Sequence, residues 1–171
     1  MEVRSIEAIV KALNDVKVKY LIVGGLAVNA HGFVRMTRDL DLVLQLETSN
    51  CSRGLQALIN LGYELAIPEA PEAFSDPESR KRWKNEKNMI VLKLWSDEHA
   101  RTPVDLFIYE PFDFEKEYSQ AMLVEVGPSI QAPFVGLKAL LDMKRSTGRS
   151  ADEEDIRELE RIKEHVDEKE N

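Results

Sequence analysis

Residues 20–25 of the chain read Tyr-Leu-Ile-Val-Gly-Gly, and residues 39–44 read Asp-Leu-Asp-Leu-Val-Leu. The first stretch is a short apolar run that stops at a glycine pair, which is typical of a buried strand followed by a sharp turn. The second stretch alternates, which predicts a strand with the leucines on one face and Asp39 and Asp41 on the other. The centre of the expected fold is therefore a buried strand, a tight turn, and a strand that carries two carboxylates.

Around this centre, the order of the predicted elements indicates an α+β domain with a mixed sheet. Residues 89–95 and 104–109 are expected to be strands that pair as an antiparallel hairpin. The other expected strands are residues 63–67, 122–126 and 129–131, and the expected helices are residues 5–18 with Ser5 as the cap, 26–31, 48–61, 133–147 and a final helix from residue 150.

Residues 68–88 have a different character from the rest of the chain. They contain three prolines, many charges and few apolar residues. This composition predicts a flexible surface excursion with about one turn of helix, within a single domain that spans residues 1–171. The basic cluster at 80–84, Arg-Lys-Arg-Trp-Lys, is interpreted as a solvated helix, with contact to an RNA end as the alternative.

Composition excludes several classes of function. The 23 basic and 31 acidic residues give a net charge of −8, which argues against a general nucleic-acid or DNA coat. No apolar run approaches the roughly 20 residues that span a bilayer, and the N-terminus resembles an amphipathic helix more than a signal peptide, so we expect a cytoplasmic protein without membrane contact. Cys51 is the only cysteine, which excludes an intramolecular disulfide and favours a packing role for its side chain.

The carboxylates are the strongest candidates for chemistry. Asp39 and Asp41 leave the same face of one strand, and Asp105 can join them if its predicted strand is a neighbour. Converging carboxylates repel one another unless a cation is present, and hard oxygen ligands suit Mg²⁺ or Mn²⁺. The structural alternative is that these residues are ordinary turn or cap residues, because Asp-Leu-Asp also occurs by chance.

Residues near the carboxylates could bind phosphate. The turn at Gly24 and Gly25 exposes backbone N–H groups, although a tight strand-to-helix connection explains the glycine pair equally well. Arg35, Thr37 and Arg38 directly precede Asp39, where cations and a hydroxyl could contact a triphosphate. Taken one at a time, these three residues are more often surface decoration.

Together, these motifs resemble the polymerase-beta-type nucleotidyltransferase superfamily. The glycine pair is followed by thirteen residues, then Asp39-Leu40-Asp41, and later by the strand carboxylate of Val104-Asp105-Leu106. The strings 21–28, Arg-x-Thr-x-Asp-Leu-Asp at 35–41 and Met-Lys-x-x-x-Gly-Arg-x-x-Asp-x-x-Asp-Ile at 143–156 are similar to the branch that contains AbiEii-type toxins and related small bacterial proteins.

The resemblance implies that the mixed sheet is largely antiparallel and flanked by helices, and that the protein binds a nucleoside triphosphate and two magnesium ions. Asp39, Asp41 and Asp105 would ligate the metals, and Asp105 would also help to activate the attacking hydroxyl. Gly24, Gly25, Arg35, Thr37, Arg38 and Lys144 would contact the triphosphate, and Asp152 would orient a basic side chain.

The chain departs from the family pattern in two places. Many members have a serine at the second position of the glycine pair, where this chain has Gly25, so backbone or a basic side chain would have to supply that phosphate contact. Larger relatives continue into a helical domain, so acceptor recognition is expected to be minimal here or supplied by a partner.

Two functions follow from the sequence. The first is an enzyme that transfers a nucleoside monophosphate from a triphosphate to the hydroxyl of an RNA end, a protein or a small molecule. The alternative is a non-catalytic module of the same fold, such as an antitoxin or regulatory subunit with a helical partner protein.

Overall fold

Strands of the described residues form one mixed sheet. The structure is a computed structural model that describes residues 1–148 and 150–170; Arg149 of the string quoted above lies outside this range. Within it, seven strands pair in the order β3-β4-β5-β2-β1-β7-β6. Their bounds are β1 (Tyr20–Val23), β2 (Leu40–Leu44), β3 (Glu64–Leu65), β4 (Val91–Trp95), β5 (Val104–Phe107), β6 (Met122–Gly127) and β7 (Ile130–Phe134).

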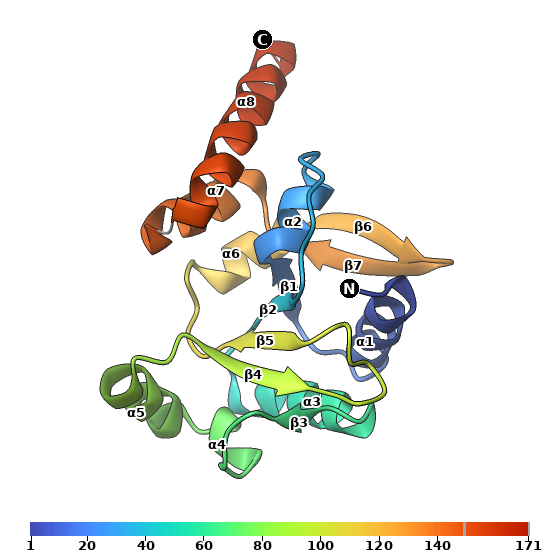
Figure 1. Cartoon of the computed structure of the whole chain (residues 1–171), viewed down its shortest axis with the longest axis vertical. Coiled ribbons are helices and arrows are strands. Elements are labelled where there is room, and N and C mark those ends of the chain that lie inside the picture. The colour runs from blue at the N-terminus through green and yellow to red at the C-terminus, as the bar shows by residue number, and fades with distance from the viewer. Residues whose placement is uncertain (149, 171) are drawn as a thin grey trace.

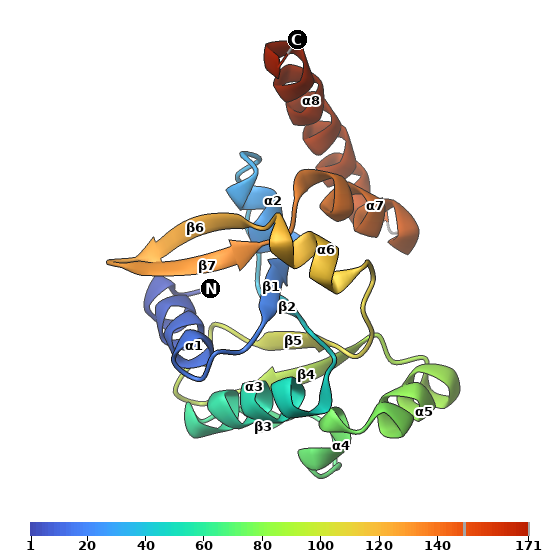
Figure 2. The ribbon, with the colours of Figure 1, turned by 180° about the vertical axis from the view of Figure 1, so that it is seen from behind.

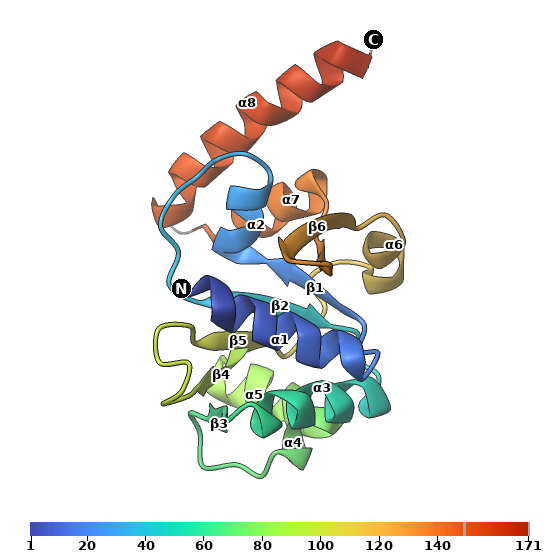
Figure 3. The ribbon, with the colours of Figure 1, turned by 90° about the vertical axis from the view of Figure 1, so that its right-hand side faces the viewer.

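Helices pack around this sheet and leave part of one face open. In Figure 1, β4 and β5 face the viewer with no helix in front of them, whereas Figure 2 shows α1 and α3 on the opposite side. Figure 3 shows α8 extending away from the body of the protein. The helices are α1 (Val3–Asp15), α2 (Gly24–Ala30), α3 (Thr48–Asn60), α4 (Glu72–Ser75), α5 (Pro77–Lys87), α6 (Phe114–Ser119), α7 (Leu137–Thr147) and α8 (Glu153–Glu170), with a 3₁₀ turn at Ser150–Asp152.

The core explains why the central strands form where they do. All four residues of β1 are buried, as are Leu40, Leu42, Val43 and Leu44 of β2. β1 pairs antiparallel with β2, and β2 pairs parallel with β5. The hairpin expected from residues 89–109 forms as antiparallel β4 and β5. The predicted fold class, an α+β protein with a mixed sheet flanked by helices, is confirmed.

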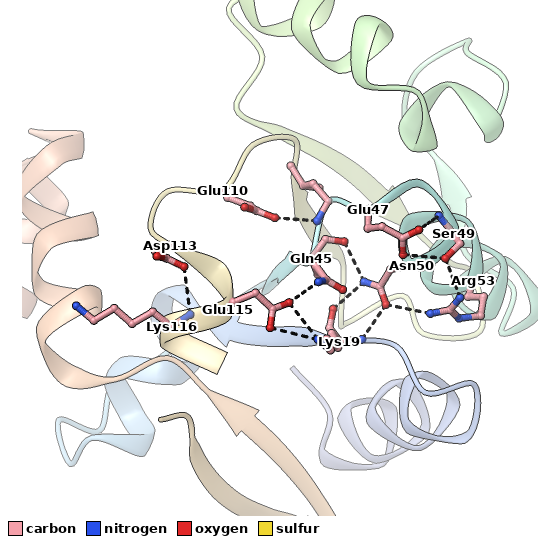
Figure 4. A network of polar contacts seen from close by, with 11 residues as sticks. Lys19, Gln45, Glu47, Ser49, Asn50, Arg53, Glu110, Asp113, Glu115 and Lys116 are labelled. Atoms are coloured by element: carbon pink, nitrogen blue, oxygen red, sulfur yellow. Dashed lines mark hydrogen bonds and ion pairs between the residues drawn. The ribbon is translucent and has the colours of Figure 1, made fainter. Parts of the chain in front are cut away.

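A polar network fixes one end of β1 and β2 (Figure 4). The Asn50 side chain accepts from the Lys19 backbone N–H at 2.9 Å and donates to the Lys19 and Gln45 carbonyls at 2.9 and 3.0 Å. Lys19 Nζ also binds Glu115 at 3.0 Å, which attaches α6. Because β1 and β2 are antiparallel, this network holds the end of the strand pair opposite to Gly24 and Asp41.

Residues 68–88 contain more helix than the sequence predicts. They form α4 and α5, with Phe74 and Trp83 fully buried. Asp76 caps α5 by accepting from the N–H groups of Glu78 and Ser79, and Pro77 occupies the first turn. The prediction of a single helical turn is wrong because the Asp-Pro start signal and the burial of Phe74 and Trp83 stabilise helix in an otherwise polar segment.

The basic cluster at 80–84 is also partly buried. Arg80 is 6% exposed and donates to the carbonyls of Phe74 and Leu46, at 2.5 and 3.2 Å. Trp83, the aromatic residue of the cluster, is fully buried. Stacking of a base on Trp83 is therefore excluded in this structure; Arg80 and Trp83 pack α5 against the body, whereas Lys81, Arg82 and Lys84 are exposed.

Several helix starts differ from the prediction, including α2, which begins at Gly24, and α8, which begins at Glu153 after the 3₁₀ turn. Ser5 lies inside α1, which begins at Val3, and its hydroxyl lies 3.0 Å from His99 Nδ1 in the interior. The helix expected from Pro133 begins at Leu137 instead, because residues 130–134 form β7. β7 pairs with both β6 and β1, so tertiary pairing overrides the local helix signal of Pro133.

None of the helices in the described part of the chain is both long and apolar enough to cross a membrane.

Candidate active site

The sheet places two of the predicted carboxylates side by side. Asp41 of β2 is directly opposite Asp105 of β5 in the parallel register, and Asp39 immediately precedes β2. All three line one cleft of about 520 Å³. Burial, and then the charges of Asp39 and Asp105, raise the pKa of Asp41 to about 7. The three carboxylates therefore repel one another in the way that the sequence predicts.

The same cleft collects every residue that the sequence singled out. Its lining includes Gly24, Gly25, Arg35, Thr37, Arg38, Asp39, Asp41, Asp105 and Lys144. These residues come from α2, the loop at 31–39, β2, β5 and α7, so only the tertiary fold brings them together. Their shared location is observed, whereas the role of each residue is still a prediction.

Lys93 is a cation at this site that the sequence reasoning missed. It faces Asp105 across the antiparallel β4–β5 pair, and its Nζ lies 2.9 and 3.2 Å from the two Asp105 carboxylate oxygens. The hydrogen bond to Asp105 raises the pKa of Lys93. The predicted hairpin could have identified Lys93, because it pairs residues 89–95 with residues 104–109 and so places a lysine of one strand near Asp105 of the other.

The donor chemistry of the three carboxylates fits a hard divalent cation such as Mg²⁺. In residues 1–148 and 150–170, however, no three acidic, histidine or cysteine side chains are already gathered closely enough to hold a metal ion. The Asp105 carboxylate binds Lys93 instead. Asp105 would therefore have to turn from Lys93 toward Asp39 and Asp41 to complete a metal site.

The glycine pair allows a close approach of α2 to the carboxylates. Gly24 has a φ of +64°, and a Cβ atom there would overlap the carboxylate of Asp41. The backbone N–H of Gly25 donates to Asp41, so in this structure it serves the carboxylate. A Cβ atom at Gly25 would overlap the Thr37 hydroxyl. The Thr37 hydroxyl thus occupies the space that a serine side chain at position 25 would need.

Lys144 and Arg35 belong to an ion-pair cluster beside the carboxylates. Lys144 Nζ lies 2.6 Å from Asp152 and 2.8 Å from Asp155, and the Lys144 side chain is 11% exposed. Arg35 binds Asp155 through two nitrogens, at 2.5 and 2.6 Å. Burial favours a higher pKa for Asp155, but the hydrogen bonds from Arg35 and Lys144 outweigh it and lower that pKa.

This cluster changes the roles expected for its members. Asp152 does orient a basic side chain, Lys144, as the resemblance implies. Asp155 was part of the matched string but had no predicted role, and it connects the loop at 31–39 with α7 and α8. Arg35 is held by Asp155, so Arg38, which is exposed and lines the cleft, is better placed to reach a phosphate.

Comparisons with known proteins support the fold. No protein-family model matches the sequence, and no curated protein matches it. Among solved structures, the lincosamide antibiotic adenylyltransferase LnuA with lincomycin bound is 16% identical, with a TM-score of 0.53 over 87% of this chain and 90% of its own. ANT(2″)-Ia in complex with adenylyl-2″-tobramycin is 13% identical, with a TM-score of 0.56 over 99% of this chain and 98% of its own.

A third similar structure is an antigenic nucleotidyltransferase-like protein from Paracoccidioides brasiliensis. It is 16% identical, with a TM-score of 0.54 over 94% of this chain and 75% of its own. The chain therefore shares the fold of these nucleotidyltransferases along most of its length.

Proposed function

We propose that this protein is a nucleotidyltransferase that moves a nucleoside monophosphate from a nucleoside triphosphate to an acceptor hydroxyl. The observation that carries the proposal is the register that places Asp41 beside Asp105, with Asp39 at the start of the same strand. The raised pKa of Asp41 shows that this arrangement is costly without a cation. Strongly perturbed pKa values cluster at functional sites, which supports the proposal.

In this proposal Asp39, Asp41 and Asp105 hold Mg²⁺ or Mn²⁺. The bound ions would supply positive charge at the attacking and leaving oxygens of the transfer. The acceptor oxygen forms a bond to the α-phosphorus, the bond from that phosphorus to the β-phosphate oxygen breaks, and pyrophosphate leaves. Asp105 is placed to take the hydroxyl proton once it has turned from Lys93.

The other residues of the cleft would position the triphosphate. Thr37 offers a hydroxyl beside α2, which would replace the hydroxyl of the serine that many family members have at position 25. Lys144 places a cation close enough to Asp41 to lower its pKa, and Arg38 is an exposed cation of the lining. We propose that Lys144 is held ready for phosphate by Asp152 and Asp155, which would retain it while the cleft is empty of nucleotide.

We favour a small molecule as the acceptor over an RNA end or a protein side chain. The solved structures with this fold include an adenylyltransferase with lincomycin bound and ANT(2″)-Ia in complex with adenylyl-2″-tobramycin. The volume of the cleft, about 520 Å³, also falls in the usual range for small-molecule sites. The string at 143–156 supports placement near the AbiEii branch, and we expect the protein to act in the cytoplasm.

Thermal unfolding with and without Mg²⁺ and each triphosphate tests the proposal. At a ligand concentration of about 100 times Kd, binding should stabilise the parent by about 2.7 kcal/mol, or about 5–10 °C. Asp41→Asn and Asp105→Asn should lose most of this shift, whereas Asp97→Asn, an exposed carboxylate in the turn after β4, should keep it.

The transfer itself is tested with α-³²P-labelled triphosphates incubated with the protein, Mg²⁺ and either cellular RNA, protein or a small-metabolite extract. Label should appear in the small-metabolite fraction and depend on Asp105. A parent that shows neither stabilisation nor labelling would refute the enzyme and favour the partner-module alternative.

A further inference from the structure

We infer that the β5 side of the cleft, formed by Ile90, Phe107 and Tyr109, is the acceptor subsite, and that it takes a hydroxyl compound with a flat apolar body and no positive charge. These three residues are called the β5 wall below. The inference deepens the proposed function and rests on it. It arises from four observations: strand register, ring geometry, the position of the polar residues, and the charges in the cleft.

Strand register places Phe107 beside Asp105, and Ile90 and Tyr109 line the same cleft just outside the bounds of β4 and β5. Asp105 and Phe107 are two positions apart on β5, so their side chains leave the same face of the sheet. Val91 lies opposite Phe107, and the backbone N–H of Ile108 donates to the Ile90 carbonyl at 3.1 Å, which continues the pairing beyond the strand end. A compound that touches these rings can therefore bring a hydroxyl to the proton acceptor at Asp105.

The rings are fixed in place and still accessible. Phe107 and Tyr109 pack edge to face, with ring centroids 5.9 Å apart and an interplanar angle of 63°. Lys84 Nζ lies 4.0 Å from the centroid of the Tyr109 ring, so it covers part of that ring. Both rings line the cleft while half-buried, and Ile90 is 44% exposed. Apolar surface exposed inside a charged cleft indicates a ligand with an apolar surface of its own.

The position of the polar residues assigns this wall to the acceptor and not to the nucleotide. The candidate phosphate contacts, Thr37, Arg38 and Lys144, come from the loop at 31–39 and from α7. The β5 wall lies at the β4–β5 pair instead, on the other side of Asp41 from these phosphate contacts. In an in-line displacement the attacking and leaving oxygens lie on opposite sides of the phosphorus. With the triphosphate on the α7 side, the attacking hydroxyl enters from the β5 side.

The charges exclude a polycationic acceptor. The carboxylates of the described cleft lining are Asp39, Asp41, Asp105 and Asp152. The first three are the proposed metal ligands, and Asp152 binds Lys144 at 2.6 Å. Lys84 and Lys93 add positive charge beside the wall. An acceptor with several ammonium groups would therefore meet cations at the β5 wall and no carboxylate reserved for them.

Three aromatic alcohols of matched shape test this inference. The probes are benzyl alcohol, 4-(hydroxymethyl)benzoate and 4-(aminomethyl)benzyl alcohol, which are neutral, anionic and cationic. Binding to the full chain is followed by ligand-observed NMR with Mg²⁺ and an α,β-methylene triphosphate that cannot be transferred. We expect the neutral and anionic alcohols to bind at least about tenfold more tightly than the cationic one, a difference of about 1.4 kcal/mol.

Variants of the wall separate acceptor binding from nucleotide binding. Phe107→Leu and Tyr109→Leu keep apolar volume but remove a ring, and each should weaken alcohol binding at least about fivefold while leaving the Kd of the nucleotide within about twofold. Trp95→Leu is the matched control, because Trp95 is 43% exposed on the same face of β4 but outside the cleft lining. Circular dichroism confirms that each variant is folded.

Each failure has its own signature. Normal nucleotide binding by the parent without alcohol binding overturns the acceptor subsite alone. Wall variants that weaken the nucleotide as much as the alcohol show that the wall holds the nucleobase, which also overturns it, as does preference for the cationic probe. A parent that binds no nucleotide refutes the proposed function and the inference together.

Discussion

Replacement of Asp41 by Asn should stabilise the protein in chelator, and its effect should depend on pH. The pKa of Asp41 is raised from 3.8 to about 7 by burial and by the charges of Asp39 and Asp105. The protonated form is therefore favoured in the folded protein. Asp41 contributes stability at low pH, and this contribution is lost as the pH rises toward about 7.

The pKa values set the size of the effect. Each unit between the folded and unfolded pKa corresponds to about 1.4 kcal/mol. Relative to its value at low pH, the free energy of unfolding is therefore lowered by Asp41 by about 1.6 kcal/mol at pH 5 and by at most about 4 kcal/mol above pH 7. Partial exposure of Asp41 reduces both figures. The free energy of unfolding of Asp41→Asn relative to the parent should therefore rise by about 2 kcal/mol between pH 5 and pH 8.

Asp155→Asn is the matched control, with the same chemical change at a buried carboxylate. Arg35 and Lys144 lower the pKa of Asp155, so its charged form stabilises the fold at neutral pH. Its replacement should cost about 3–5 kcal/mol, because a buried carboxylate charge is removed from its ion pairs with Arg35 and Lys144, which are only partly exposed. Urea unfolding in EDTA at pH 5 and pH 8 measures both variants. An Asp41→Asn variant that loses as much stability at pH 8 as Asp155→Asn would refute the reasoning.

Three further substitutions separate the parts of the cleft. Lys144→Met should lower the free energy of unfolding in urea by about 3 kcal/mol, because the Lys144 ammonium pairs with two carboxylates. It should also weaken triphosphate binding more than Mg²⁺ binding. An unchanged affinity for the nucleotide would show that Lys144 does not contact the triphosphate. Lys93→Met should strengthen Mg²⁺ binding in calorimetry, because the Asp105 carboxylate loses its competing cation; weaker binding would contradict this. Gly24→Ala should cost about 2 kcal/mol in thermal unfolding, because its φ is +64° and its Cβ would overlap Asp41; an unchanged Tm would contradict the close approach.

The sequence predicts the centre of this fold well because the signals there are local. The apolar run at 20–23, the glycine turn and the alternating leucines at 40–44 each specify their own element, and all three form as expected. The predicted hairpin of β4 and β5 also forms. The parallel pairing of β5 with β2, which sets Asp105 beside Asp41, was only a condition in the sequence and depends on the tertiary fold.

What the sequence could not predict depends on contacts between distant residues. Pro133 reads locally as a helix start, but pairing with β1 and β6 makes it part of a strand. The sequence also does not show that Asp155, 120 positions later, binds the Arg35 guanidinium. Lys93 has no motif around it, and only the β4–β5 register shows that it faces Asp105.

The overlap between position 25 and Thr37 has an evolutionary consequence. A serine at position 25 and a threonine at position 37 would occupy the same space. A protein that changed Gly25 to serine and kept Thr37 would therefore have a steric overlap at this point. The two positions can therefore be expected to change as a pair, with serine at 25 accompanied by glycine at 37, because a Cβ atom at position 25 would also overlap the Cβ atom of Thr37. Among descendants of a common ancestor, the hydroxyl would then stay at one point in space while the residue that carries it moves twelve positions along the chain.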